Sequence, residues 1–216
     1  MIAITLAVLT LAGVGALFAT GVFTNTISLA GINISSTITR TKEGQQSVEP
    51  SLPAGKTGTL STRTDDNTGV VTAESGHGIT ISDTVDVYWT GGVRYGMSVT
   101  NVATDDVTVD LGDGDVLPDQ DTAVIITPRV EVDIDFTGDN VEMFAALCDK
   151  RAYIEFTTEG DANITESELL AGEAWSWHNN SGVTNPFASA VVGKVQATCG
   201  EATAGTLQIG VLLDSV

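Results

Sequence analysis

The stretch Val130–Phe136, VEVDIDF, decides the class of fold. Apolar residues occupy every second position, and carboxylates occupy the positions between them without a break. Because successive side chains of a strand point to opposite faces, this pattern predicts a β-strand with one buried and one wet face. Ala152–Phe156 repeats the pattern, with Arg151, Tyr153 and Glu155 expected on the wet face.

The rest of the C-terminal half continues in the same way. Val191–Ala197 and Leu207–Leu213 predict later strands, and the unbroken apolar run of the second is typical of a central position in a sheet. Glu166–Leu170 is expected to form a short helical turn. We therefore predict a β-sandwich over residues 121–216, with Greek-key or jelly-roll connections.

Residues 58–120 contain shorter strands between tight turns. In Val85–Trp89 the apolar residues alternate with Asp86 and Tyr88, which we expect on a wetter face. Gly91-Gly92 then favours a hairpin turn, and further Asp- and Asn-rich clusters separate the other strands. Several short strands in so compact a stretch predict a small antiparallel barrel, so the chain is expected to be all-β.

One run within this barrel resembles a short β module of tailed-phage and prophage structural proteins. The run is Ser75–Val99, SGHGITISDTVDVYWTGGVRYGMSV, in which a Gly-His-Gly turn precedes an aspartate and a strand. The resemblance implies a structural part of a virion or of a prophage-derived particle. The positions that carry it are Gly76, His77, Gly78, Asp83, Val85 and Val87.

The N-terminal part of the chain has a different character, because residues 1–39 contain no charged side chain. Residues 1–24 form an apolar arm, and Ile2–Phe23 is long enough to cross a ~30 Å hydrocarbon layer as a helix. Three placements stay open: a membrane helix, an element buried between copies in an assembly, and a core element of the body. Residues 25–57 are expected to form a strand and then a linker rich in turn residues.

The net charge of −19 limits the possible partners. Nucleic acid is not expected, because phosphates require a basic face and the chain has only nine Lys and Arg against 28 Asp and Glu. The charge favours solubility, and it also suits salty or cation-rich surroundings that screen self-repulsion. Other copies of the same chain are the expected partners, and a membrane is possible through residues 2–23.

Seven aspartates lie in the stretch Asp105–Asp121, DDVTVDLGDGDVLPDQD. Closely spaced Asp and Gly are typical of calcium loops, although the order of an EF-hand is absent. Asp110, Asp113 and Asp115 are the candidate metal ligands, and a solvated turn region is the alternative. No other cofactor is expected.

Trp175, Trp177 and His178 lie in the stretch AWSWHNNSGVTNP, and they are the candidate binding or contact residues. Two tryptophans at i and i+2 share a face of an extended segment, and aromatic faces can bind sugars. The alternatives are that a tryptophan fills the sandwich or that the pair makes a subunit contact. Cys148 and Cys199 can form one disulfide in an exported protein or remain buried thiols in a cytoplasm, and their spacing does not decide between the two.

The sequence contains no nucleophile elbow, phosphate loop, zinc spacing or dinucleotide fingerprint, and we do not expect an enzyme. His77 has no potential partner nearby in sequence and is expected to cap a turn. We expect a structural subunit of a multi-copy assembly, located in a virion or another extracellular assembly. The alternatives are a pilus-like filament subunit of the cell surface and a membrane-anchored, carbohydrate-binding β domain.

Overall fold

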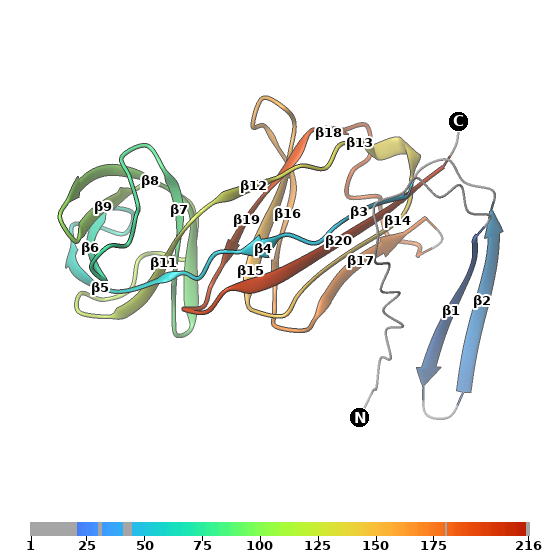
Figure 1. The fold of residues 1–216 in the computed structure, drawn as a ribbon, viewed down its shortest axis with the longest axis horizontal. Coiled ribbons are helices and arrows are strands. Elements are labelled where there is room, and N and C mark those ends of the chain that lie inside the picture. The colour runs from blue at the N-terminus through green and yellow to red at the C-terminus, as the bar shows by residue number, and fades with distance from the viewer. Residues whose placement is uncertain (1–20, 30–31, 41–44, 180, 215–216) are drawn as a thin grey trace.

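The computed structural model describes residues 21–29, 32–40, 45–179 and 181–214 (Figure 1). This part of the chain is almost entirely β-strand, and its single helical turn is the 3-10 helix Gly138–Asn140. The prediction of an all-β chain with a small antiparallel barrel followed by a sandwich is confirmed. The predicted helical arm lies outside the described residues up to position 20, and residues 21–24 open a β-strand. Among the described residues, no helix has the length and apolar character needed to cross a membrane.

The barrel consists of six antiparallel strands in a closed ring with one short strand attached to it. Ring neighbours follow the order β8-β7-β11-β5-β6-β9, and pairing of β8 with β9 closes the circle. The apolar residues of these strands fill its interior, which includes Leu60, Val87 and Ile126. The bounds are β5 Lys56–Arg63, β6 Gly69–Ala73, β7 Thr84–Trp89, β8 Gly92–Ala103, β9 Asp106–Asp110, β10 Asp113–Gly114 and β11 Ala123–Pro128.

The sandwich packs a four-stranded sheet, β12-β19-β15-β16, against a second sheet, β17-β14-β20-β3, with β4 also on β20. A small pair, β13-β18, lies at one end, and apolar side chains from both sheets form one core. The bounds are β3 Gln45–Val48, β4 Ser51–Leu52, β12 Val130–Val132, β13 Phe136–Thr137, β14 Val141–Cys148, β15 Ala152–Thr157, β16 Asn163–Leu169, β17 Ala174–His178, β18 Val191–Val192, β19 Lys194–Cys199 and β20 Gly205–Leu213.

The chain runs through the sandwich first, because β3 and β4 pair with the last strand, β20. It then builds the barrel from β5 to β11 and returns to the sandwich at β12 (Figure 1). The boundaries therefore differ from the expected ones at residues 57 and 120. β11 belongs to the barrel because it pairs with β5 and β7, and residues 45–52 belong to the sandwich rather than to a linker.

Two local expectations also differ from the structure. Glu166–Leu170 lies mostly in strand β16 rather than in a helical turn, because it pairs in register with β15. The stretch Val130–Phe136 keeps its alternating burial, yet Asp133–Asp135 between β12 and β13 belong to no strand.

A β-hairpin formed by β1 (Gly21–Leu29) and β2 (Ile32–Arg40) takes up the end of the uncharged N-terminal segment and extends to Arg40, the first charged residue. Nine residue pairs join the two strands, from Gly21 opposite Arg40 to Leu29 opposite Ile32. In the described chain, neither strand pairs with a strand of the barrel or the sandwich.

Candidate functional site

In the described part of the chain, no group of three or more His, Cys, Asp or Glu that could hold a metal ion is found, and the calcium site at Asp110, Asp113 and Asp115 stays a prediction. The Asp110 carboxylate accepts a hydrogen bond from the Thr68 hydroxyl at 2.7 Å and another from the Leu111 N–H. Asp115 accepts one from the Val93 N–H at 3.2 Å, while Asp113 is exposed on β10. Asp110 and Asp115 thus hold turns of the barrel together.

The tryptophan pair shares one face of β17, and this face is turned to the sandwich core. Trp177 is 7% exposed and its indole N–H donates to the Val183 carbonyl at 2.9 Å. Trp175 is half-buried and packs edge-on against Phe144, with 4.9 Å between ring centroids. His178 is exposed on the opposite side of the strand. The two aromatic rings therefore contribute to the core of the sandwich.

Cys148 on β14 and Cys199 on β19 are both buried free thiols in the sandwich core. Burial raises the pKa of each thiol. Since the thiolate is the reactive form, this environment makes both groups less nucleophilic at neutral pH.

His77 closes the turn that precedes β7. Its Nδ1 accepts a hydrogen bond from the Ile79 N–H at 2.9 Å, and its Nε2 lies 3.1 Å from the Thr104 carbonyl. Because Nδ1 accepts, the arrangement requires a neutral ring with its proton on Nε2, which then donates to the carbonyl.

A buried polar network, which we call the joint, connects the barrel to the sandwich, although the sequence pattern predicted wet faces for several of its residues. The Asp86 side chain of β7 is fully buried. It accepts hydrogen bonds from the Gly96 N–H at 2.7 Å and from the Thr198 hydroxyl at 2.6 Å, and it forms an ion pair with Arg129 at 3.1 Å. Arg129 lies between β11 and β12, where the chain leaves the barrel, and its guanidinium also pairs with Glu155 of β15.

Aromatic rings surround these charges. The Tyr88 hydroxyl lies 2.6 Å from the Thr198 hydroxyl, and Tyr95 of the barrel stacks on Tyr153 of the sandwich with 4.0 Å between centroids. Arg129 lies 5.0 Å from the centre of the Tyr153 ring, in a cation–π arrangement. Asp86, Tyr88, Tyr153 and Glu155 are predicted on wet faces, and all four are buried because residues of β7 and β8 meet residues of β15 and β19 where the two modules join.

The electrostatics of the joint follow from its burial. Burial raises the pKa of Asp86, while the contact with Arg129 and the hydrogen bonds from Thr198 and Gly96 oppose the rise. Burial alone would lower the pKa of Arg129, but Asp86 and Glu155 more than offset this and raise it, so the guanidinium stays charged. The ion pairs of Arg129 and the hydrogen bond between Asp86 and Thr198 thus link side chains of the two modules.

A hollow of about 440 Å³ lies beside the joint, lined partly by Trp89, Ile125 and Arg151. Arg151 is already engaged there, because it forms an ion pair with Glu168 and its guanidinium lies 5.2 Å from the centre of the Tyr88 ring.

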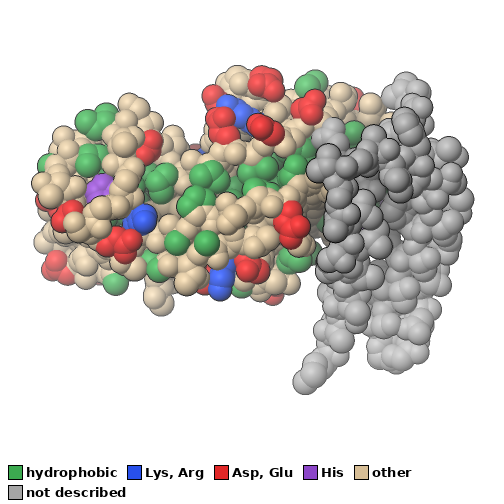
Figure 2. Space-filling view, in the orientation of Figure 1, with side chains coloured by type: hydrophobic (Ala, Val, Ile, Leu, Met, Phe, Trp, Pro, Cys, Tyr) green, Lys and Arg blue, Asp and Glu red, His purple; other side chains and the backbone are tan. Residues whose placement is uncertain are grey.

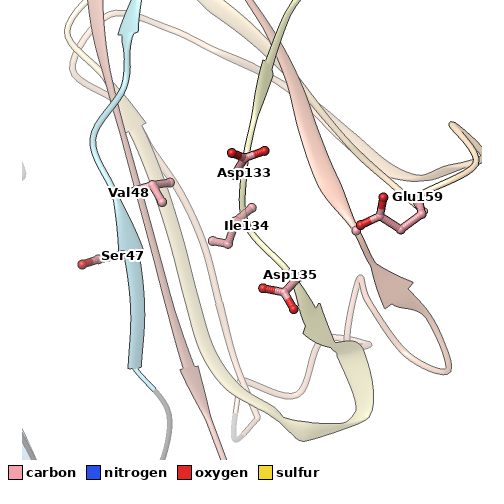
Figure 3. Close-up of a pocket in the computed structure, with 7 residues that line it drawn as sticks. Ser47, Val48, Asp133, Ile134, Asp135 and Glu159 are labelled. Carbon is pink, nitrogen blue, oxygen red and sulfur yellow. The ribbon is translucent and has the colours of Figure 1, made fainter. Parts of the chain in front are cut away.

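A larger groove of about 550 Å³ lies on the open side of the sandwich (Figure 3). One side is formed by Ser47 and Val48 of β3, and the other by the extended segment Asp133–Asp135, as Figure 3 shows. Glu159 and Gly193 complete the lining. Three exposed carboxylates therefore line a groove with apolar side chains at Val48 and Ile134, and such a lining attracts positively charged groups.

No family model, no curated protein and no solved structure matches this chain.

Proposed function

We propose that the protein is a non-enzymatic structural subunit whose uncharged N-terminal segment joins it to other copies of itself. The observation that carries this proposal is the division of the chain into two parts. Residues 1–39 contain no charged side chain, and their β1–β2 hairpin pairs with no other strand of the described chain. All 28 acidic residues lie in the remainder.

The charge of the body explains why the joining element is uncharged. Carboxylates lie over both modules on the face seen in Figure 2, with few Lys or Arg between them. Two bodies of this charge repel each other, and the repulsion extends over about 10 Å at moderate ionic strength. An uncharged segment can approach such a body without this electrostatic cost.

The joint is consistent with a structural role, because a subunit of an assembly must keep its shape under forces from neighbouring subunits. The two modules are coupled by the ion pair of Asp86 with Arg129 and by the stacked rings of Tyr95 and Tyr153. The chain also crosses between them twice, from β4 to β5 and from β11 to β12. A virion or prophage-derived particle is the assembly that we propose, on the basis of the resemblance of residues 75–99 to phage structural modules.

The experiment is electron microscopy of the purified full chain, with sedimentation velocity on the same sample. We expect regular tubes, rings or shells, and an association that strengthens as ionic strength rises because salt screens the body charge. Single copies that bind detergent micelles or lipid vesicles would instead favour the membrane-anchored alternative. Single copies that stay soluble without either would contradict the proposal.

A further inference from the structure

The segment Val130–Thr137 has the sequence and burial of a strand but lacks a neighbour on one side. Its inner side pairs with β19 at Val130–Val132 and with β18 at Phe136–Thr137. Val132, Ile134 and Phe136 are 6%, 4% and 5% exposed, so the alternation continues through the break. β12 is the last strand of its sheet, and in the described chain no strand lies on its outer side.

The opposite wall of the groove is a second unpaired edge. β3 is the last strand of the other sheet and pairs only with β20 among the described strands. The side chain of Val48 points toward the segment Asp133–Asp135 across the groove, and Ser47 precedes it on the same strand (Figure 3). A strand edge presents N–H and C=O groups that a further strand can bind, and extended peptides commonly bind proteins in this way.

The carboxylates of the groove favour binding of a segment with basic side chains. Asp133 and Asp135 are two positions apart, so they project to the same side of the segment. In the described chain, no ion pair or hydrogen bond engages the side chains of Asp133, Asp135 or Glu159. A strand with basic residues two positions apart would place opposite charges side by side, which stabilises cross-strand pairs.

The basic residues of the body are already engaged. Six of the seven from Lys56 onward pair with Asp or Glu side chains, and Arg94 donates to the Leu111, Gly112 and Asp115 carbonyls. The six ion-paired residues are Lys56, Arg63, Arg129, Lys150, Arg151 and Lys194. The two other basic residues of the sequence are Arg40 and Lys42, and they too are two positions apart.

We propose that the groove between β3 and Asp133–Asp135 binds the segment Ser36–Lys42 of a second copy as an added strand, with Arg40 and Lys42 beside Asp133 and Asp135. This inference rests on the proposed function and gives it a specific contact. β2 pairs only with β1 among the described strands, so its other edge can join the groove. The same segment that is free of charge up to residue 39 thus ends in the two charges that fit the groove.

The first test is a charge exchange in the full chain, followed by sedimentation velocity over a range of concentrations. Asp133→Lys with Asp135→Lys, or Arg40→Asp with Lys42→Asp, should each weaken association about tenfold or more, because attraction becomes repulsion. All four substitutions together should restore most of the affinity. Asp113→Lys with Glu173→Lys is the matched control, since it changes two exposed carboxylates outside the groove and should not weaken association.

The outcomes separate this inference from the proposed function. If the wild-type chain associates and the groove substitutions act like the control, or the fourfold exchange fails to restore affinity, the groove inference is wrong and the proposed function stands.

A second measurement tests the groove even if the wild-type chain proves monomeric, a result that would overturn the proposed function alone. A fluorescein-labelled peptide with the sequence of residues 32–44 is added to the full chain carrying Arg40→Asp and Lys42→Asp, whose groove cannot be filled by its own segment. We expect fluorescence anisotropy to rise, and to stay flat when Asp133→Lys and Asp135→Lys are also present. If the anisotropy of the peptide stays unchanged with both protein variants, the inference is wrong.

Discussion

At the scale of single residues, the pair formed by Asp86 and Arg129 matters most. Asp86 is fully buried, the Arg129 side chain is 10% exposed, and each forms hydrogen bonds or ion pairs with groups of both modules. Removing one partner of a buried ion pair leaves an uncompensated charge, which costs far more than the net contribution of the intact pair.

We therefore predict that Arg129→Leu lowers the free energy of unfolding by about 3–5 kcal/mol. Lys150→Met is a suitable comparison, because Lys150 pairs with Glu201 near the surface and such pairs contribute less than about 1 kcal/mol. Urea unfolding of both variants gives the two values. Equal losses in both variants would show that the joint does not depend on this charge pair.

The direction in which stability changes with pH should follow from the direction of the pKa shift of Asp86. Burial raises the pKa of this carboxyl in the folded protein, so at pH values between the unfolded and the folded pKa the folded state binds more protons than the unfolded state. The stability that this group contributes is fully present below its unfolded pKa and is lost as pH rises through its folded pKa. We predict that the stability of the wild type relative to Asp86→Asn increases as pH falls through this window, measured by urea unfolding at several pH values. A decrease over the same window would mean that the ion pair with Arg129 outweighs burial and lowers the pKa.

At the scale of strands, alternation of apolar and polar residues was a reliable guide to which segments are strands. Val85–Trp89 and Ala152–Phe156 form β7 and most of β15 as predicted. The prediction that the polar faces of these strands are exposed to water was wrong. Periodicity shows that a strand has two faces and does not show what covers the second one. Tyr88 and Tyr153 carried the available signal, since large aromatic side chains seldom point into solvent without a partner.

The candidate site was harder to predict for the same reason. The groove and the joint are built from segments far apart in sequence, such as β3 and Asp133–Asp135, or β7 and β19. Pairing with the preceding strand, β15, decides the structure of Glu166–Leu170, and the local preference of this stretch gave no indication of that pairing. Local patterns therefore predicted the fold class but not the two places where the strands meet.

The packing of β17 on the sandwich core gives a prediction at this scale. Trp177→Ala should destabilise the protein by about 3–5 kcal/mol, as expected for truncation of a buried aromatic side chain. Leu170→Ala is the control, because that leucine is 51% exposed and its truncation should change stability by about 0.5 kcal/mol or less. Thermal or urea unfolding measures both variants. If Trp177→Ala is as mild as the control and abolishes binding on a glycan array, the carbohydrate-binding alternative gains support.

At the scale of the whole molecule, the chain divides into an acidic body, whose two modules are linked by the joint, and an uncharged segment that precedes it. The body contains its own cores, and its strands begin with β3 at Gln45. Removing the residues before β3 should therefore leave the barrel and the sandwich folded. The contacts that we propose between copies should be lost at the same time, because both the apolar arm and the basic pair Arg40 and Lys42 are removed.

Sedimentation velocity of the full chain beside a variant lacking residues 1–44 tests this division most directly. We predict that the full chain sediments as an oligomer, more strongly at high ionic strength, and that the shortened chain sediments as a single folded copy at every concentration. Near-ultraviolet circular dichroism of the shortened chain confirms that the tryptophans keep their packed environment. A full chain that is monomeric in the absence of detergent or lipid, or a shortened chain that still associates, would contradict the proposal that the N-terminal segment joins the copies.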